Sequence, residues 1–304
     1  MSAELPRELR EYAYTPDRFA ALSDELTRFA DERVCVLEGS TFASVSGVRV
    51  AADELPGLVE EVRARVPADK HPHWWLDPET EPADAAERLL ELGLRTPSDE
   101  HEWLQAVVTT EPPAETPGVD VRRVETPAEF VQARTILWDV AGRDEAWRAR
   151  ERPRLESMFE AHERSGTLSH FVAYLDGKPA ATASSVHSDR GSFLIGGCVL
   201  PEARGHGLYR ALVRARWDAA VERGRPALIS HAVPETSYPI LKRLGFVDAG
   251  RLRRLEDPQT CSGASGGRSG ARPGATGGAS GTTVGSSGSG SSKPATPSTS
   301  SATK

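Results

Sequence analysis

Residues 196–212 read GGCVLPEARGHGLYRAL, an apolar segment that passes through an Arg-Gly-x-Gly turn directly into an amphipathic helix. Such a turn leaves several backbone N–H groups unpaired at the N-terminus of the helix. A helix N-terminus with free N–H groups is suited to a phosphate or a pyrophosphate. The stretch therefore predicts an anion-binding loop between a buried strand and a helix.

Two common phosphate motifs do not fit this turn. A dinucleotide-binding fingerprint would need a third glycine at the position of Arg210. A P-loop would need Gly-Lys-Ser/Thr, which is absent from the turn. The alternative interpretation is a plain strand-to-helix turn that binds no ligand, in which glycine merely allows a positive φ.

Composition separates a tail from the rest of the chain. Of 304 residues, those from 257 to 304 are mostly Gly, Ser, Thr, Ala and Pro. A segment so poor in apolar side chains cannot offset its ordering entropy, so we expect it to be disordered. The preceding 256 residues are enough for one large or two small domains.

Charge and cysteine content narrow the class of protein. The formal net charge is −7 for the whole chain, and about −10 without the tail, which holds four basic residues and one acid. This balance argues against nucleic acid or an anionic membrane as a partner. Three scattered cysteines do not predict a disulfide framework or a zinc site, and no signal peptide or run of about 18 apolar residues is found. We expect a reduced, cytoplasmic protein.

A Pro-rich stretch at 111–118 predicts a linker between residues 1–110 and residues 119–256. In the second unit we expect strands at 119–124, 170–174, 180–187, 193–200, 227–232 and 246–255, and helices at 126–140, 144–163, 207–223 and 236–244. In the first unit we expect strands at 34–37, 42–50, 73–77 and 102–108, and helices at 53–66 and 83–92. The pattern predicts an α/β (α+β) fold in which helices flank a mixed, mostly antiparallel central sheet, with a smaller N-terminal α/β domain.

The two units resemble each other at a shift of 152 residues. Leu89 to Leu94 then fall on Leu241 to Phe246, and Gly47-Val48 fall on Val199-Leu200. The order of elements is also the same, which suggests a diverged internal duplication, although short Leu-rich matches also arise by chance. At the shifted position of the turn, the first unit has Asp53 and Glu54. These carboxylates would repel a phosphate, so we expect the first unit not to bind the same ligand.

The residues that flank the turn resemble those of a known protein family. Val199-x-Pro201-x-x-Arg204-Gly205-x-Gly207, followed by Leu244-Gly245-Phe246 after a short helix, resembles the GNAT superfamily of acyl-CoA-dependent N-acyltransferases. The resemblance covers residues 119–255, and the first unit would be a degenerate GNAT-like half. It implies that acetyl-CoA is the cosubstrate, with no metal, and that a small-molecule or peptide amine is the acceptor in a monomer or homodimer.

The resemblance also assigns residues to coenzyme A. The loop and helix start that hold the pyrophosphate correspond to Arg204, Gly205, His206, Gly207, Leu208 and Tyr209. The strand that splays from its neighbour and pairs with the pantetheine arm corresponds to Cys198, Val199 and Leu200. Direct attack of a neutral amine on the thioester would then be assisted by a backbone N–H near Val199, which stabilises the oxyanion.

Two positions depart from the family pattern. Tyr209 stands where Gly or Ala is usual, and Leu241 stands where a tyrosine often protonates the leaving thiolate. Tyr238, three residues before Leu241, lies on a similar helix face and is our candidate acid. His231 and Glu235 are our main candidate bases, and His187 is a further one.

Other readings are weaker. Cys198 suggests an acyl-enzyme, but a small buried hydrophobe is the more common role of such a cysteine. His71-x-His73 has the spacing of a metal pair without a third ligand nearby. A non-catalytic acyl-CoA sensor or scaffold and an interaction protein that uses its tail are the rival functions.

Overall fold

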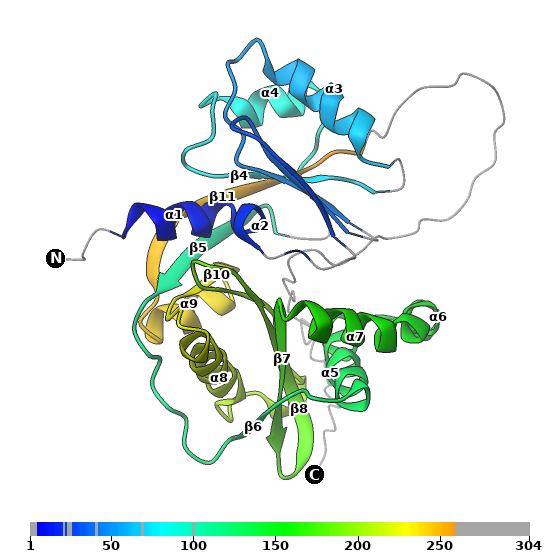
Figure 1. The fold of residues 1–304 in the computed structure, drawn as a ribbon, viewed down its shortest axis with the longest axis vertical. Coiled ribbons are helices and arrows are strands. Elements are labelled where there is room, and N and C mark those ends of the chain that lie inside the picture. Colours follow the sequence, from blue (N-terminus) through cyan, green and yellow to red (C-terminus); the bar gives the residue numbers. More distant parts are fainter. Residues whose placement is uncertain are drawn as a thin grey trace, which may run out of the picture.

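One mixed sheet runs through the molecule in this computed structural model, which describes residues 5–20, 22, 26–39, 42–67, 70–98 and 101–258 (Figure 1). Its spatial order is β1 (Thr27–Ala30), β2 (Cys35–Glu38), β3 (Ala43–Ser46), β4 (His73–Leu76), β11 (Val247–Glu256), β5 (Trp103–Thr109), β10 (Leu228–Ala232), β9 (Ser192–Val199), β8 (Lys178–His187), β7 (Leu168–Leu175) and β6 (Asp120–Arg123). Within the described residues, β3–β4 and β9–β10 are the parallel neighbours. The expected mixed, mostly antiparallel sheet is confirmed.

Helices cover both faces of the sheet. The residues on one side of each strand contact α3 (Leu55–Arg65), α4 (Ala85–Glu91), α8 (Leu208–Glu222) and α9 (Ser237–Arg243). Those on the other side contact α1 (Arg7–Tyr14), α5 (Pro127–Val140) and α7 (Leu155–Ser165). In β5, for example, Val107 faces α8 and α9, whereas Ala106 and Val108 face α1. We call these the α8 face and the α1 face.

The last strand of each half lies against the other half. We define the N-terminal half as residues 5–110 and the C-terminal half as residues 119–256. Strand β5 pairs with β10 and β11, and β11 pairs with β4 as well as β5. The halves therefore exchange their final strands and form one continuous sheet.

The chain order β3–α3–β4–α4–β5 is matched by β9–α8–β10–α9–β11. Shifting α4 by 152 residues gives the bounds of α9. Each of these helices ends on a glycine in the left-handed region, with φ of 92° at Gly93 and 91° at Gly245. The next residue then bonds back in the same way, from Leu94 N to Leu89 O and from Phe246 N to Leu241 O. The two halves therefore have the same local structure at the ends of α4 and α9.

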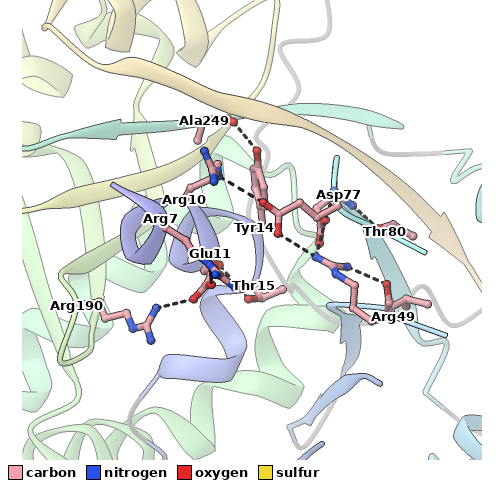
Figure 2. Close-up of polar contacts among 12 residues, drawn as sticks. Arg7, Arg10, Glu11, Tyr14, Thr15, Arg49, Asp77, Thr80, Arg190 and Ala249 are labelled. Carbon is pink, nitrogen blue, oxygen red and sulfur yellow. Dashed lines mark hydrogen bonds and ion pairs between the residues drawn. The ribbon is translucent and has the colours of Figure 1, made fainter. Parts of the chain in front are cut away.

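Helix α1 joins parts of both halves, as Figure 2 shows. The Tyr14 hydroxyl donates to the Ala249 carbonyl at 2.6 Å, and Arg190 pairs with Glu11 at 3.2 Å. Tyr12 and Ala13 are fully buried against β5, β10 and β11. The helix thereby closes the α1 face over the exchanged strands.

Some elements differ from the sequence-based expectation. Helix α1, α2 (Pro16–Phe19) and β1 were not expected. The expected helix at 144–163 is instead α6 (Glu145–Glu151), a 3₁₀ turn at Arg152–Arg154 and α7, because Pro153 lacks the N–H that a continuous helix needs. The expected tail begins at Asp257, yet Asp257 is fully buried and pairs with Arg63 at 2.9 Å. Residues 259–304 lie outside the described part of the chain.

Candidate functional site

The start of α8 has no side-chain cap of its own. Gly205 and Gly207 have φ of 86° and 79°, a conformation that favours glycine, and Gly207 is the N-cap residue. By contrast, the Thr126 and Glu129 side chains form a capping box at the start of α5. Arg204 and His206 are exposed beside the first turn of α8. Backbone donors and basic side chains thus meet at one point, an arrangement that suits an anion.

The rest of the loop is tightly packed. A Cβ atom at Gly207 would lie 2.7 Å from Cγ2 of Thr116 in the connection between the halves. Leu208 is 2% exposed and its side chain belongs to the core under α8. Gly207 therefore has both a conformational and a steric reason to be glycine.

Strand β9 separates from β10 after two residues. The parallel pairing covers Ser192 with Leu228 and Phe193 with Ile229, and β9 then continues to Val199. On the other edge of β9, the register with β8 shifts at Gly196-Gly197, where Gly196 has φ of 60°. A bulge of this kind bends a strand away from its neighbour. The expected splay lies in the predicted place, next to the loop.

A cavity of about 70 Å³ lies in this splay. Its walls come from β9, α8, β10 and the start of α9. The lining residues are Leu194, Ile195, Gly196, Gly197, Tyr209, Arg216, Ser230, His231, Val233, Thr236 and Ser237.

Tyr209 and Arg216 reach the cavity from α8. A Cβ atom at Gly197 would lie 3.1 Å from Cε2 of Tyr209 and 3.5 Å from Nη2 of Arg216, so this glycine permits the close approach of both side chains. Burial raises the pKa of Tyr209, and the positive charge of Arg216 opposes that rise. Sequence reasoning placed Tyr209 at the pyrophosphate and missed Arg216. The available signal was an arginine on the apolar face of the helix, among Leu212, Val213, Trp217 and Ala220.

His231 lines the cavity with its ring on the α1 face. Its Nε2 lies 2.8 Å from the Ala13 carbonyl, which can only accept, so Nε2 carries the proton and donates it. The ring packs against Phe193 and Trp75, with centroid distances of 4.8 and 5.6 Å. Burial lowers the pKa of His231 to about 4, so the imidazole is neutral at pH 7.

Tyr238 and Glu235 lie outside the cavity lining. Burial and the neighbouring carboxylate of Asp248 raise the pKa of Tyr238. Glu235 is exposed, 3.9 Å from Nδ1 of His101. Leu241, at the family's tyrosine position, is fully buried beside Phe246. The structure thus brings His231, but not Tyr238 or Glu235, to the splay.

The side chains of Cys198 and His187 are buried and do not line the cavity. The Cys198 side chain lies in the core beneath α5 and α7, and burial raises its pKa to about 12, so the thiol stays protonated. His187 contacts the hydroxyls of Ser192 and Ser169 at 2.8 and 2.9 Å, and burial lowers its pKa to about 4. Val199 and Leu200 are half-buried at the end of β9.

The corresponding place in the N-terminal half is closed. Three residues of the short strand β3, Ser44, Val45 and Ser46, pair with β4. Before α3, the Glu54 carboxylate accepts a hydrogen bond from Ala51 N at 3.0 Å. A carboxylate therefore lies where the C-terminal half has Arg204 to Gly207.

A second hollow, of about 370 Å³, lies at α1, α2 and the end of β3. Several of its lining charges pair with acids or bases nearby, including Arg7 with Glu11 at 2.8 Å and Arg49 with Asp77 at 3.0 Å (Figure 2). Within the described residues no cluster of His, Cys, Asp and Glu could hold a metal. No helix of the described part of the chain is long and apolar enough to span a membrane.

Comparison with known families agrees with this geometry. Residues 133–246 match the family described as acetyltransferase (GNAT) family. The match includes the loop, the splay and the Gly245-Phe246 pair. A search of curated protein sequences finds no match.

Solved structures resemble nearly the whole described chain. A GCN5-related N-acetyltransferase from Kribbella flavida is 20% identical, covers 77% of this chain and 90% of its own, and has a TM-score of 0.58. A functionally unknown conserved protein from Staphylococcus epidermidis is 14% identical, covers 80% of this chain and 97% of its own, and has a TM-score of 0.53. The similarity at these identities is one of fold, and it extends over both halves.

Proposed function

We propose, from the match of residues 133–246 to the GNAT acetyltransferase family, that the protein is an acetyl-CoA-dependent N-acetyltransferase. It transfers acetyl to an amine by direct attack on the thioester. The observation that carries this proposal is the splay of β9 from β10 beside the uncapped start of α8. One end of this arrangement suits a pyrophosphate, and the other offers strand edges to an amide-bearing arm.

Acetyl-CoA would bind from the α8 face. Arg204, Gly205, His206 and Gly207, with the backbone of Leu208, hold the pyrophosphate. The backbone of Cys198, Val199 and Leu200 meets the pantetheine arm, which places the thioester at the bulge. Family members use acetyl-CoA, and the reaction needs no metal.

Candidate catalytic residues reach the cavity from opposite faces of the sheet. Tyr209 and Arg216 approach the cavity from the α8 face, and His231 lies on the α1 face, against Ala13. An amine held on the His231 side of the splay would attack the carbonyl carbon while sulfur leaves toward α8. A backbone N–H near Val199 would stabilise the oxyanion of the tetrahedral intermediate.

His231 is our proposed base, because it is the imidazole that lines the cavity. Its Nδ1 carries the lone pair, since Nε2 donates to Ala13. The ammonium of the tetrahedral adduct is more acidic than a free ammonium ion, so a weakly basic imidazole can take this proton, directly or through water. Tyr238 and Glu235 stay lesser candidates for acid and base.

The remaining roles follow from the two halves. We propose that residues 1–110 are a degenerate GNAT-like unit without coenzyme A, joined through 111–118 to the transferase domain at 119–256. The acceptor is a small-molecule or peptide amine. We propose a cytoplasmic monomer or homodimer in which the tail after Asp257 is dispensable for transfer.

A second candidate function is a non-catalytic acyl-CoA sensor or scaffold. It is favoured by Leu241, which has no hydroxyl where the family often has its tyrosine. Such a protein would bind acetyl-CoA at the same loop without transferring the acetyl group.

Calorimetric titration with acetyl-CoA, followed by a screen of amines that detects the released thiol, tests both candidates. We expect one molecule of acetyl-CoA per chain and thiol release with at least one amine. Binding without turnover on any amine would favour the sensor. Absence of binding would refute both functions.

A further inference from the structure

Arg216 is a buried cation without an anionic partner in the described part of the chain. It is 1% exposed, in the middle of α8. Its Nε donates to the Leu212 carbonyl at 3.1 Å and its Nη1 to the Ser184 carbonyl at 3.4 Å. Nη2 has no hydrogen-bond partner, and Arg216 lines the splay cavity. A buried charge is costly unless it is paired, so an anion that forms during the reaction is a suitable partner.

Tyr209 lies beside this cation in the same cavity. The two residues are seven apart on α8, which places them on one face of the helix. Both approach Gly197 at the bulge, within 3.6 Å of the position that a Cβ atom would take there. Tyr209 and Arg216 are therefore at the place where the thioester is expected.

We propose that Tyr209, supported by Arg216, protonates the coenzyme A thiolate and so replaces the tyrosine that is absent from position 241. This inference rests on the proposed function and adds a catalytic acid to it. It also joins the two departures from the family pattern, since the tyrosine at 209 supplies the hydroxyl that Leu241 lacks.

The amine nitrogen forms a bond to the carbonyl carbon, and His231 or a water takes its proton. The C–S bond then breaks, its electron pair stays on sulfur, and the Tyr209 O–H proton moves to sulfur. The products are the amide, coenzyme A thiol and a tyrosinate held beside the Arg216 guanidinium. The proton on the base returns to Tyr209 through solvent.

The charge of Arg216 favours this route at two points. A guanidinium in a buried cavity stabilises both the thiolate that forms and the tyrosinate that remains. Burial lowers the pKa of Arg216, while the neighbouring Tyr209 acts in the opposite direction. An arginine keeps its charge in such a site, which a lysine would not reliably do.

The first test is Tyr209→Phe in the full chain. We expect the Kd for acetyl-CoA to stay within about threefold of wild type, while kcat falls about 100-fold, the usual contribution of a general acid. The fall of wild-type kcat at high pH should also be absent from the variant. Thiol release is measured with an active amine or, before one is known, as slow hydrolysis of acetyl-CoA.

The second test is Arg216→Met, with coenzyme A itself as the probe. We expect the bound thiol to ionise at a higher pH in the variant, seen as a shift in the ultraviolet absorbance of the thiolate. Tyr174→Phe is the matched control for Tyr209→Phe. Tyr174 lies in β7, outside the cavity lining, and its hydroxyl donates to Gln132 at 3.2 Å, so kcat of this variant should be unchanged.

The outcomes separate the two proposals. An active wild type with unchanged kcat and pH profile in Tyr209→Phe would overturn this inference and leave the proposed function intact. Loss of the high-pH limb in Tyr238→Phe instead would overturn it in favour of Tyr238. A wild type that neither binds nor cleaves acetyl-CoA would remove the proposed function and this inference together.

Discussion

The two halves place the same elements around different strand junctions. In the N-terminal half, β3 is paired with β4 from Ser44 to its last residue, Ser46, and Glu54 occupies the turn before α3. In the C-terminal half, β9 leaves β10 after Phe193, and the turn before α8 holds Arg204 and two glycines. The open junction thus differs from the closed one in a bulge and in the charge of its turn.

The two junctions also differ in how completely their strands are paired. The closed junction completes its strand pairing and buries Trp74 fully. The open junction leaves strand edges without that pairing and keeps Arg216 in a cavity. Such unfavourable local features are expected where a ligand must bind.

Separating the halves should have the largest effect. A fragment of residues 111–258 lacks β5, the strand between β10 and β11. We expect this fragment not to fold, as judged by circular dichroism and gel filtration, and co-expression with residues 1–110 to restore a folded, acetyl-CoA-binding pair. A folded, binding fragment on its own would show that the exchanged strand is dispensable.

Reversing the charge of the open loop should abolish most coenzyme A affinity. In Arg204→Glu/His206→Glu, both side chains are exposed, so the fold should be retained. We expect the Kd for acetyl-CoA to rise about 100-fold in calorimetry, roughly tenfold for each carboxylate beside the pyrophosphate. The matched N-terminal variant Glu54→Gln should leave the affinity and the stoichiometry of one unchanged. A second bound molecule in that variant would mean that charge alone closes the N-terminal junction.

On acidification, the buried histidines of the C-terminal half and the buried aspartates of the N-terminal half should change the stability of the protein in opposite directions. Burial lowers the pKa of His170 to about 3 and of His187 to about 4, both in the C-terminal half. Below about pH 6.5 the unfolded chain therefore binds more protons than the folded chain. The free energy of unfolding falls as the pH falls, by about 2 kcal/mol per histidine at pH 5. In the N-terminal half, burial raises the pKa of Asp17 and Asp77. Protonation of these two carboxylates on acidification therefore raises the free energy of unfolding.

Urea unfolding at pH 7 and pH 5 checks this contrast. We expect the free energy of unfolding to fall less with acidification in His170→Asn than in wild type. The exposed His71→Asn should retain the wild-type pH dependence. Equal pH dependence in all three proteins would show that His170 is not the titrating group.

Much of the C-terminal half could be predicted, because its signals are local. Thr126 begins α5, the Asp176-Gly177 turn joins β7 to β8, and the glycines of the loop mark the start of α8. The splay was predicted from the family pattern around Val199. These features depend on residues close together in the chain.

The rest depends on tertiary contacts. The apolar alternation of Trp103 to Thr109 predicts a strand but not its partners, so the exchange of β5 and β11 could not be derived. Helix α1 is mostly polar and owes its place to Tyr12, Ala13 and Tyr14. Arg216 was missed because helical spacing shows that it faces the core, whereas the absence of an acid nearby is known only from the fold.

The exchanged strands have a consequence for synthesis of the protein. Strand β4 ends at Leu76, but its partner β11 begins at Val247, so one edge of β4 stays unpaired until the C-terminal half has left the ribosome. At ordinary rates of translation this interval is roughly 10–30 s. An unpaired strand edge is prone to association with other chains. We therefore expect the nascent N-terminal half to require a chaperone or rapid elongation.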